Sequence, residues 1–325
     1  MHHTRLCHAC VVALAWASFT LADTATHTAT WLDTWHDPAR RRDVPVKVYA
    51  PTDDGSRPIV IFSHGLGGSR EGYRYLAEHW ASQGYVVVML QHPGSDDAVW
   101  RTVPPRDRMV ALRKAAVEPG NLINRPLDVR FAIDTLTALN HRDGRLKDRL
   151  DLDRIGVAGH SFGAYTTLAV AGQSFPTRLG EVGLADPRVK AAIAMSAPVP
   201  GDPSRYAASY RNITMPVLHM TGTHDDSAIG DTPAAKRRVP FDHHPGGPGR
   251  EQYLIILDGG DHMVFSGRRP RGDLASDGAH HALILAATTL FWDATLRGDA
   301  DARNALHAGQ LQRLADDIAT VEVKP

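Results

Sequence analysis

Residues 155–164 read Ile-Gly-Val-Ala-Gly-His-Ser-Phe-Gly-Ala, and this stretch decides the fold. Its apolar start is typical of a short buried strand, and residues 164–171 after it favour a helix. Ser161 stands at the apex of the turn between them, with Gly159 and Gly163 two positions away on either side. A turn this tight strains its apex residue and brings strand and helix close, so a Cβ at either glycine would clash. The stretch predicts a nucleophile elbow; the alternative is a Gly/Ser loop that caps an ordinary helix.

The rest of the chain alternates apolar strand segments with helical segments. Strands are expected, after an opening pair at 30–35 and 44–49, at residues 57–62, 85–90, 154–158, 189–195, 217–220 and 253–257. Helices are expected at residues 70–83, 128–139, 164–171 and 279–296. This order predicts an α/β fold in which helices cover both faces of a mostly parallel sheet.

Three segments depart from this alternation. Residues 95–126, with a small charged helix at about 106–118, and residues 227–250, rich in Pro, Gly, His and Arg, both follow strand ends. Open α/β sheets bind ligands at the carboxyl ends of their strands, so we expect a lid and a rim loop there. Structural loops without a role are the alternative. Residues 299–325 are expected to form one more surface helix, because leucines recur in them at helical spacing.

The first 22 residues are typical of a secretory signal peptide. A weakly positive start precedes an apolar run at 9–21, and small residues stand at positions suited to cleavage after residue 22. The run is short for a membrane span, and an uncleaved anchor is the alternative. We therefore expect a periplasmic or secreted protein in which residues 23–325 form a single domain. Cys7 and Cys10 both lie in the first segment, so the mature chain is expected to have no disulfide.

Composition and motifs argue against several classes of partner. Lys plus Arg and Asp plus Glu number 36 each, so no overall charge favours nucleic acid or an anionic membrane. Neither G-x-G-x-x-G nor a phosphate loop occurs, and no nucleotide cofactor is expected. The pairs His243-His244 and His280-His281 are candidates for a metal, but adjacent histidines rarely bind one ion together. No cofactor and no metal are expected, and His219, within a strand, is expected in the core.

A serine nucleophile needs a base to take its proton and an acid to orient that base. Where a serine occupies an elbow of this kind, the acid and then the base follow it along the chain. His262 lies in a Gly-Gly loop past the last expected strand, 101 residues after Ser161, and is the expected base. Asp225 and Asp226 both follow the preceding strand; we expect Asp225 to be the acid, with Asp226 as the alternative.

Two backbone N–H groups are needed to bind an oxyanion. One is expected from Phe162, the residue after the serine. The other is expected from Leu66, because residues 63–68 read Ser-His-Gly-Leu-Gly-Gly after a strand, and the glycines let that backbone bend inward. His64 is an alternative base, but its position upstream of the serine favours a role in shaping this loop.

The motifs at 63–67 and 159–163 resemble the platelet-activating-factor acetylhydrolase and dienelactone-hydrolase-like branch of the α/β-hydrolases, over roughly residues 44–296. The resemblance implies a serine esterase with Ser161 as nucleophile, His262 as base, and the N–H groups of Leu66 and Phe162 as oxyanion donors. One departure concerns the acid. The acetylhydrolases carry it just after the strand that follows the elbow helix, where this chain has Ser196-Ala197-Pro198, so phospholipid specificity is not transferred. Dienelactone hydrolases proper use a cysteine nucleophile.

The sequence thus predicts an exported serine carboxylic-ester hydrolase that works through an acyl-enzyme on a small or lipid-like uncharged ester. Its partner would be that small-molecule ester, and no stable membrane span is expected. An amidase or peptidase with the same triad is one alternative, and a hydrolase fold used only for binding is another. The preference for an uncharged acyl group comes from apolar residues expected near the cleft, which are Leu66, Tyr73, Trp100, Phe162, Met263 and Phe265.

Overall fold

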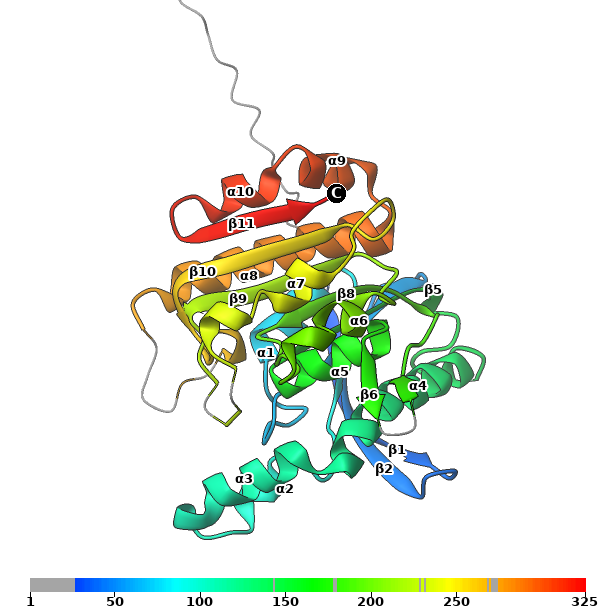
Figure 1. Cartoon of the computed structure of the whole chain (residues 1–325). Helices are drawn as coiled ribbons and strands as arrows, with labels where there is room; N and C mark the ends of the chain where they lie inside the picture. The colour runs from blue at the N-terminus through cyan, green and yellow to red at the C-terminus, as the bar shows by residue number, and fades with distance from the viewer. Residues whose placement is uncertain are drawn as a thin grey trace, which may run out of the picture.

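The strands of the predicted alternation assemble side by side into one sheet with helices on both of its sides (Figure 1). The computed structural model describes residues 27–142, 144–177, 180–227, 229–230, 232–267, 269 and 274–325. The predicted signal peptide at 1–22 lies outside the described residues. Within them, the sheet has nine strands in the order β1-β2-β4-β3-β5-β8-β9-β10-β11.

The sheet is mostly parallel, as the sequence predicts. Its centre consists of parallel strands, which are β4 (Val86–Leu90), β3 (Arg57–Ser63), β5 (Leu150–His160), β8 (Val189–Met195), β9 (Val217–His224) and β10 (Gln252–Asp261). The edges are antiparallel and consist of β1 (Thr28–Asp37) and β2 (Arg42–Pro51) on one side and β11 (Ala319–Lys324) on the other. All carboxyl ends of the central strands therefore lie along one edge of the sheet, where the candidate site is built.

Helices cover both faces of the sheet, which explains the continuously apolar strands. Along β3, Val60 and Phe62 face a layer with α1 (Arg74–Ser82) and α8 (Asp277–Trp292), while Ile59 and Ile61 face a layer with α4 (Pro119–Asn140) and α5 (Phe162–Ala171). All four side chains are fully buried. A strand with one face exposed to solvent would alternate apolar and polar residues. The continuously apolar run at 57–62 therefore indicates a sheet that is covered on both faces.

Helix α4 begins nine residues before the predicted start at 128, because a proline inside it does not break it. Pro119 occupies the first turn, where a missing N–H is harmless. Pro126 lies in the interior and leaves the carbonyl of Leu122, four residues earlier, without its helical donor. The hydroxyl of Tyr165 from α5 donates to that carbonyl at 3.2 Å instead. A contact from a distant helix therefore replaces the hydrogen bond that the local sequence lacks.

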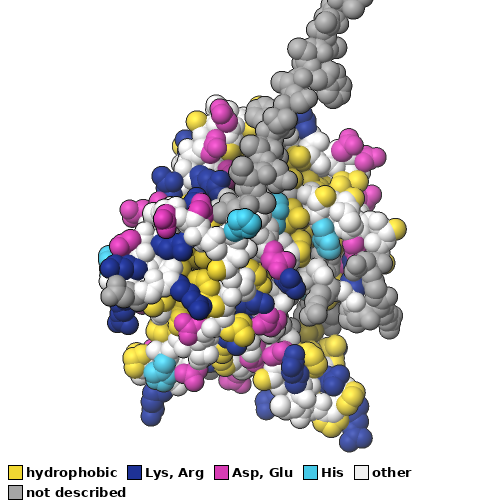
Figure 2. All heavy atoms as spheres, turned by 180° about the vertical axis from the view of Figure 1, so that it is seen from behind, with side chains coloured by type: hydrophobic (Ala, Val, Ile, Leu, Met, Phe, Trp, Pro, Cys, Tyr) yellow, Lys and Arg dark blue, Asp and Glu magenta, His cyan; other side chains and the backbone are white. Residues whose placement is uncertain are grey.

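Residues 95–126 form a projecting arm and the start of α4. The arm consists of α2 (Ala98–Arg101), η1 (Pro105–Asp107) and α3 (Arg108–Val117), which extend away from the sheet at the bottom of Figure 1. Seen from behind, the arm carries both basic and hydrophobic side chains (Figure 2), and Val110 and Val117 on it are exposed. Trp100 joins the arm to the loop after β3 by donating to the carbonyl of Gly67 at 2.8 Å. A lid function of these residues stays a prediction.

The prediction of a single surface helix at 299–325 is wrong. The segment forms α9 (Ala300–His307), α10 (Gln310–Ala315) and the edge strand β11, which pairs antiparallel with β10. Residues 319–324 read Ala-Thr-Val-Glu-Val-Lys, a β-branched alternation that favours a strand. Without β11, the strand β10 would present an unpaired edge to solvent.

The remaining elements are short and lie between the main ones. They are the hairpin β6 (Ser174–Thr177) and β7 (Gly180–Gly183), the helices α6 (Tyr206–Tyr210) and α7 (Val239–His243), the turns η2 (Pro203–Arg205), η3 (Ala234–Lys236) and η4 (Val264–Ser266), and the π-helix η5 (Asp293–Arg297). The predicted rim at 227–250 contains η3 and α7. Across the described residues, none of the helices combines the length and apolar character that a membrane crossing needs.

Candidate active site

Ser161 is the single residue between β5 and α5, and its backbone is strained. Its φ is 56° and its ψ is −118°, a region that residues with a side chain rarely occupy. A Cβ on Gly163 would lie 1.8 Å from the carbonyl oxygen of Ser63, and one on Gly159 would lie 2.3 Å from that of Gly163. Only glycine at both positions lets the end of β3, the end of β5 and the start of α5 meet, as the sequence predicts.

The structure brings the three predicted triad residues together. Ser161 Oγ lies 3.0 Å from Nε2 of His262, and Nδ1 of His262 lies 2.7 Å from Oδ1 of Asp225. Asp225 comes directly after β9 and His262 directly after β10, so both project from carboxyl ends of parallel strands. An ionised Asp225 can only accept, which holds the His262 proton on Nδ1 and leaves Nε2 to accept from Ser161. This arrangement can remove the proton of the serine hydroxyl.

Asp225 is fully buried and held by several donors. Its second oxygen, Oδ2, accepts from Ser196 Oγ at 2.6 Å and from Thr221 Oγ1 at 2.8 Å. Nε of Arg237 lies 3.5 Å from Oδ1. Burial raises the pKa of Asp225, but the hydrogen bond from His262 and the charge of Arg237 together hold it below its ordinary value. Asp225 is therefore a carboxylate at neutral pH.

The alternative acid, Asp226, lies away from His262. Asp226 is exposed and accepts from the backbone N–H of Ala234 at 2.9 Å, which ties it to the start of η3 and not to His262. Ser196 stands just after β8, where the resemblance implies the acid of the acetylhydrolases. The Ser196 hydroxyl instead donates a hydrogen bond to Asp225, which directly follows the neighbouring strand β9.

Two backbone N–H groups beside Ser161 lack acceptors. Among the described residues, neither the N–H of Leu66 nor that of Phe162 makes a hydrogen bond, although Gly67 N–H donates to Ser95 O at 2.9 Å and Gly68 N–H to Gly65 O at 3.0 Å. The loop that carries Leu66 lies against the elbow, since a Cβ on Gly65 would be 3.5 Å from the carbonyl oxygen of His160. The N–H groups predicted to bind the oxyanion are thus available.

The competing histidines have other partners. His64 is buried and its Nδ1 lies 2.6 Å from the carbonyl of Gly65, which fits a role in shaping the loop. His219 lies in the core as predicted, with Nε2 2.9 Å from Oε1 of Gln252. His281 Nε2 lies 2.8 Å from the carbonyl of Val264. No group of three or more potential metal-ligating side chains occurs in the part of the chain that the structure describes.

Sequence reasoning missed the residues that contact the site from distant segments. Arg237, in the predicted rim, donates to the carbonyls of Asp225, Ser196 and Ala197 and is buried. The ring of His160, inside the elbow motif itself, also contacts the site: its centre lies 4.7 Å from that of the His262 ring, at a tilt of 44°. No local pattern marks Arg237, because its contacts join separate segments of the chain.

The apolar residues expected near the cleft differ in their exposure to solvent. Tyr73 is buried, and its hydroxyl lies 2.9 Å from Nδ1 of His160 and accepts from the N–H of Gly65 at 3.2 Å. Phe265 is fully buried as well. Both residues lie beside His160, and Phe162 is buried too, whereas Leu66 and Trp100 are partly exposed and Met263 is exposed.

Comparison with known proteins agrees with this fold. A family model described as the alpha/beta hydrolase fold matches residues 58–217, just under half of the chain. Together with the sheet order and the elbow, this match supports the α/β-hydrolase fold that the motifs predict.

The chain is also similar to individual ester hydrolases. The chain is similar to the platelet-activating factor acetylhydrolase of Canis lupus familiaris, with 29% identity over 163 residues, which cover 42% of this chain and 37% of the relative. It is also similar to cutinase est2 of Thermobifida alba, with 26% identity over 217 residues, which cover 67% of this chain and 56% of the relative. In both cases the match spans less than two thirds of the relative's length.

Proposed function

We propose that the protein is a serine carboxylic-ester hydrolase that works through an acyl-enzyme. The observation that carries this proposal is the line of contacts from Ser161 through His262 to Asp225, at 3.0 Å and 2.7 Å, on a strained elbow. The names of the similar proteins, an acetylhydrolase and a cutinase, support ester hydrolysis over other chemistry.

In the proposed reaction, Ser161 Oγ attacks the ester carbonyl carbon and gives its proton to Nε2 of His262. Negative charge develops on the carbonyl oxygen, and the unpartnered N–H groups of Leu66 and Phe162 stabilise it. His262 then gives the proton to the leaving alkoxide oxygen, and the acyl group stays on Ser161. Water then attacks the acyl carbon and gives its proton to His262, which returns it to Ser161 Oγ as the carboxylic acid leaves. Asp225 stabilises the imidazolium in both half-reactions without taking a proton itself.

The proposed substrate is a small or lipid-like uncharged ester. Leu66, Trp100 and Met263 are apolar side chains with solvent exposure around the elbow and the loops that carry the site. The exposed Met263 directly follows His262, and Trp100 is bonded to the loop of Leu66 through Gly67. Apolar contacts there favour a neutral acyl or alkyl group over a charged one.

Export is part of the proposal and rests on the sequence of residues 1–22. Cleavage there would release a mature enzyme of residues 23–325 that consists of one domain. Amino-terminal sequencing of protein secreted from a bacterial host should begin at residue 23, and a full-length chain retained in the membrane would contradict this.

The activity is tested by comparing wild type and Ser161→Ala on p-nitrophenyl esters of increasing acyl length and on the matching p-nitroanilides. The proposal predicts that wild type prefers the esters and that kcat of Ser161→Ala falls about 10⁴- to 10⁶-fold while its thermal unfolding is unchanged. Hydrolysis by the variant at close to the wild-type rate would refute the proposal. A preference for the anilides would favour an amidase.

A further inference from the structure

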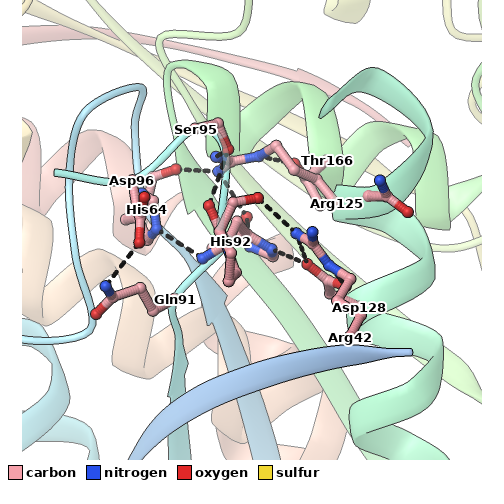
Figure 3. Close-up of polar contacts among 12 residues, drawn as sticks. Arg42, His64, Gln91, His92, Ser95, Asp96, Arg125, Asp128 and Thr166 are labelled. Atoms are coloured by element: carbon pink, nitrogen blue, oxygen red, sulfur yellow. Dashed lines mark hydrogen bonds and ion pairs between the residues drawn. The ribbon is translucent and has the colours of Figure 1, made fainter. Parts of the chain in front are cut away.

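A second buried polar cluster lies behind the candidate site, and the proposed reaction does not use it. Helix α4 supplies Arg125 and Asp128, one turn apart, and both side chains are fully buried. Figure 3 shows both side chains close to His92, together with Arg42, Ser95 and Thr166. Burying a charge without compensation lowers the stability of the fold, so the burial of these two charges needs a physical explanation.

Arg125 contacts both chain segments that carry the proposed oxyanion donors. On the Leu66 side, its Nη2 donates to Ser63 Oγ at 3.1 Å and to the carbonyl of His64. On the Phe162 side, its Nε donates to Thr166 Oγ1 at 3.0 Å in α5, and its guanidinium carbon lies 4.5 Å from the centre of the Phe162 ring. One rigid planar group therefore fixes the loop after β3 relative to the start of α5.

A chain of hydrogen bonds orients this guanidinium, and the donor and the acceptor can be assigned at each bond. Contacts with His92 and Arg42 hold the pKa of Asp128 at about 2 although burial raises it, so Asp128 accepts only. Nδ1 of His92 lies 2.9 Å from Asp128 Oδ2 and must carry the proton. Nε2 of His92 then accepts from Ser63 Oγ at 2.8 Å, which leaves the Ser63 oxygen to accept from Arg125.

The same cluster fixes the peptide group that carries the Leu66 N–H. The backbone N–H of His92 donates to His64 Nε2 at 3.1 Å, so the His64 proton lies on Nδ1 and is donated to Gly65 O at 2.6 Å. Gly68 N–H donates to the same carbonyl oxygen at 3.0 Å. In a trans peptide the C=O and the following N–H point in opposite directions. Two donors on Gly65 O thus turn the Leu66 N–H away from the cluster.

The charge of Arg125 has no direct carboxylate partner within the described residues. Its hydrogen-bond acceptors are the hydroxyls of Ser63, Ser95 and Thr166 and the carbonyl of His64. A cation without an adjacent counter-charge attracts negative charge that develops nearby, and it does so more strongly in a buried setting than in water.

We propose that Arg125 is a positioning residue for the oxyanion hole: its guanidinium fixes the segments that carry the N–H groups of Leu66 and Phe162, and its charge favours the oxyanion. This inference rests on the proposed function. It assigns Arg125 no contact with substrate, and its effect must appear in the transition state more than in substrate binding.

The test compares Arg125→Met with Leu136→Ala, a control in the same helix that leaves a cavity in the core without touching the loop after β3. We expect kcat of Arg125→Met on p-nitrophenyl butyrate to fall about 10- to 100-fold with KM changed less than about threefold, since outright loss of an oxyanion donor costs about 10²- to 10³-fold. Affinity for a trifluoromethyl ketone, which forms an anionic adduct with serine, should fall by the same factor as kcat. Arg125→Lys should recover part of both losses.

The inference is overturned if Arg125→Met keeps kcat within about threefold of wild type, if only KM changes, or if folded Leu136→Ala loses as much kcat. Should Arg125→Met show no cooperative unfolding, Ser63→Ala decides: kcat about 3- to 10-fold lower supports the inference, and an unchanged kcat overturns it. A wild-type protein without esterase activity would instead refute the proposed function, and this inference with it. Active wild type with fully active Arg125→Met refutes this inference alone.

Discussion

The carboxylate of Asp225 lies 2.7 Å from Nδ1 of His262, although the two residues follow different strands and stand 37 positions apart. The sheet makes this contact possible, because β9 and β10 are parallel neighbours whose carboxyl ends lie together. Asp226, one position further, projects to solvent and binds the N–H of Ala234. Adjacent carboxylates thus have entirely different surroundings, which mutation can distinguish.

Asp225→Asn and Asp226→Asn should affect esterase activity very differently. An amide at 225 cannot hold His262 in the required tautomer or stabilise its charged form, so kcat should fall about 10³- to 10⁴-fold. Asp226→Asn should stay within about threefold of wild type, because it loses only a surface turn contact. Steady-state rates of both variants on one p-nitrophenyl ester check this. A collapse of activity in Asp226→Asn alone would show that the acid is misassigned.

The hydroxyl of Ser196 should raise kcat by holding the Asp225 carboxylate in place. Ser196→Ala removes one of the two hydroxyl donors to Oδ2, so the carboxylate is held less firmly and kcat should fall about 3- to 10-fold. Ser209→Ala is the matched control, since Ser209 is equally buried and its hydroxyl has no partner in the part of the chain described. Equal kcat values for the two variants would argue against the role of Ser196.

Gly163 should tolerate no side chain. Its Cβ would lie 1.8 Å from the backbone of Ser63, which cannot move without displacing β3, so Gly163→Ala should lose about 3 kcal/mol or more of unfolding free energy. Gly201→Ala, where a Cβ meets no atom within 4 Å, should change stability by less than about 1 kcal/mol. Urea unfolding of both variants measures this difference. A stable Gly163→Ala protein would mean that strand and helix are further apart than described.

The stability of the fold should fall as the pH drops from about 6.5 to about 4. Burial lowers the pKa of His219 to about 4, so in this window the unfolded chain binds a proton there that the folded chain does not. His219→Gln should reduce the slope of unfolding free energy against pH by about 1 kcal/mol per pH unit. Gln252→Leu, which removes the partner of His219 but keeps the imidazole, should retain the slope. Identical slopes for wild type and His219→Gln would contradict the prediction.

The sequence was sufficient for features whose cause is local. The elbow at Ser161 follows from glycine spacing, because both glycines are required by contacts within a few residues or with the adjacent strand. The parallel sheet follows from apolar runs such as 57–62, which only a doubly covered sheet can bury. His262 could be chosen, and the acid limited to Asp225 or Asp226, because these residues follow strands whose carboxyl ends were predictable.

The remaining features depend on contacts that no short pattern encodes. Helix α4 continues through Pro126 because Tyr165 replaces the missing donor, and β11 forms because β10 offers an open edge. Arg125 and Arg237 lie in segments that look like ordinary charged helix and rim loop. Their burial beside the site results from long-range packing, which local propensity does not describe.

The central claim is that Ser161 is an activated nucleophile, and labelling with a fluorophosphonate tests it most directly. The wild-type protein should take up one phosphonyl group per chain, on the peptide that contains Ser161, and His262→Ala should label far more slowly. Mass spectrometry of a digest locates the label. Absence of label on the folded wild-type protein, or label on Ser161→Ala at the wild-type rate, would contradict the account.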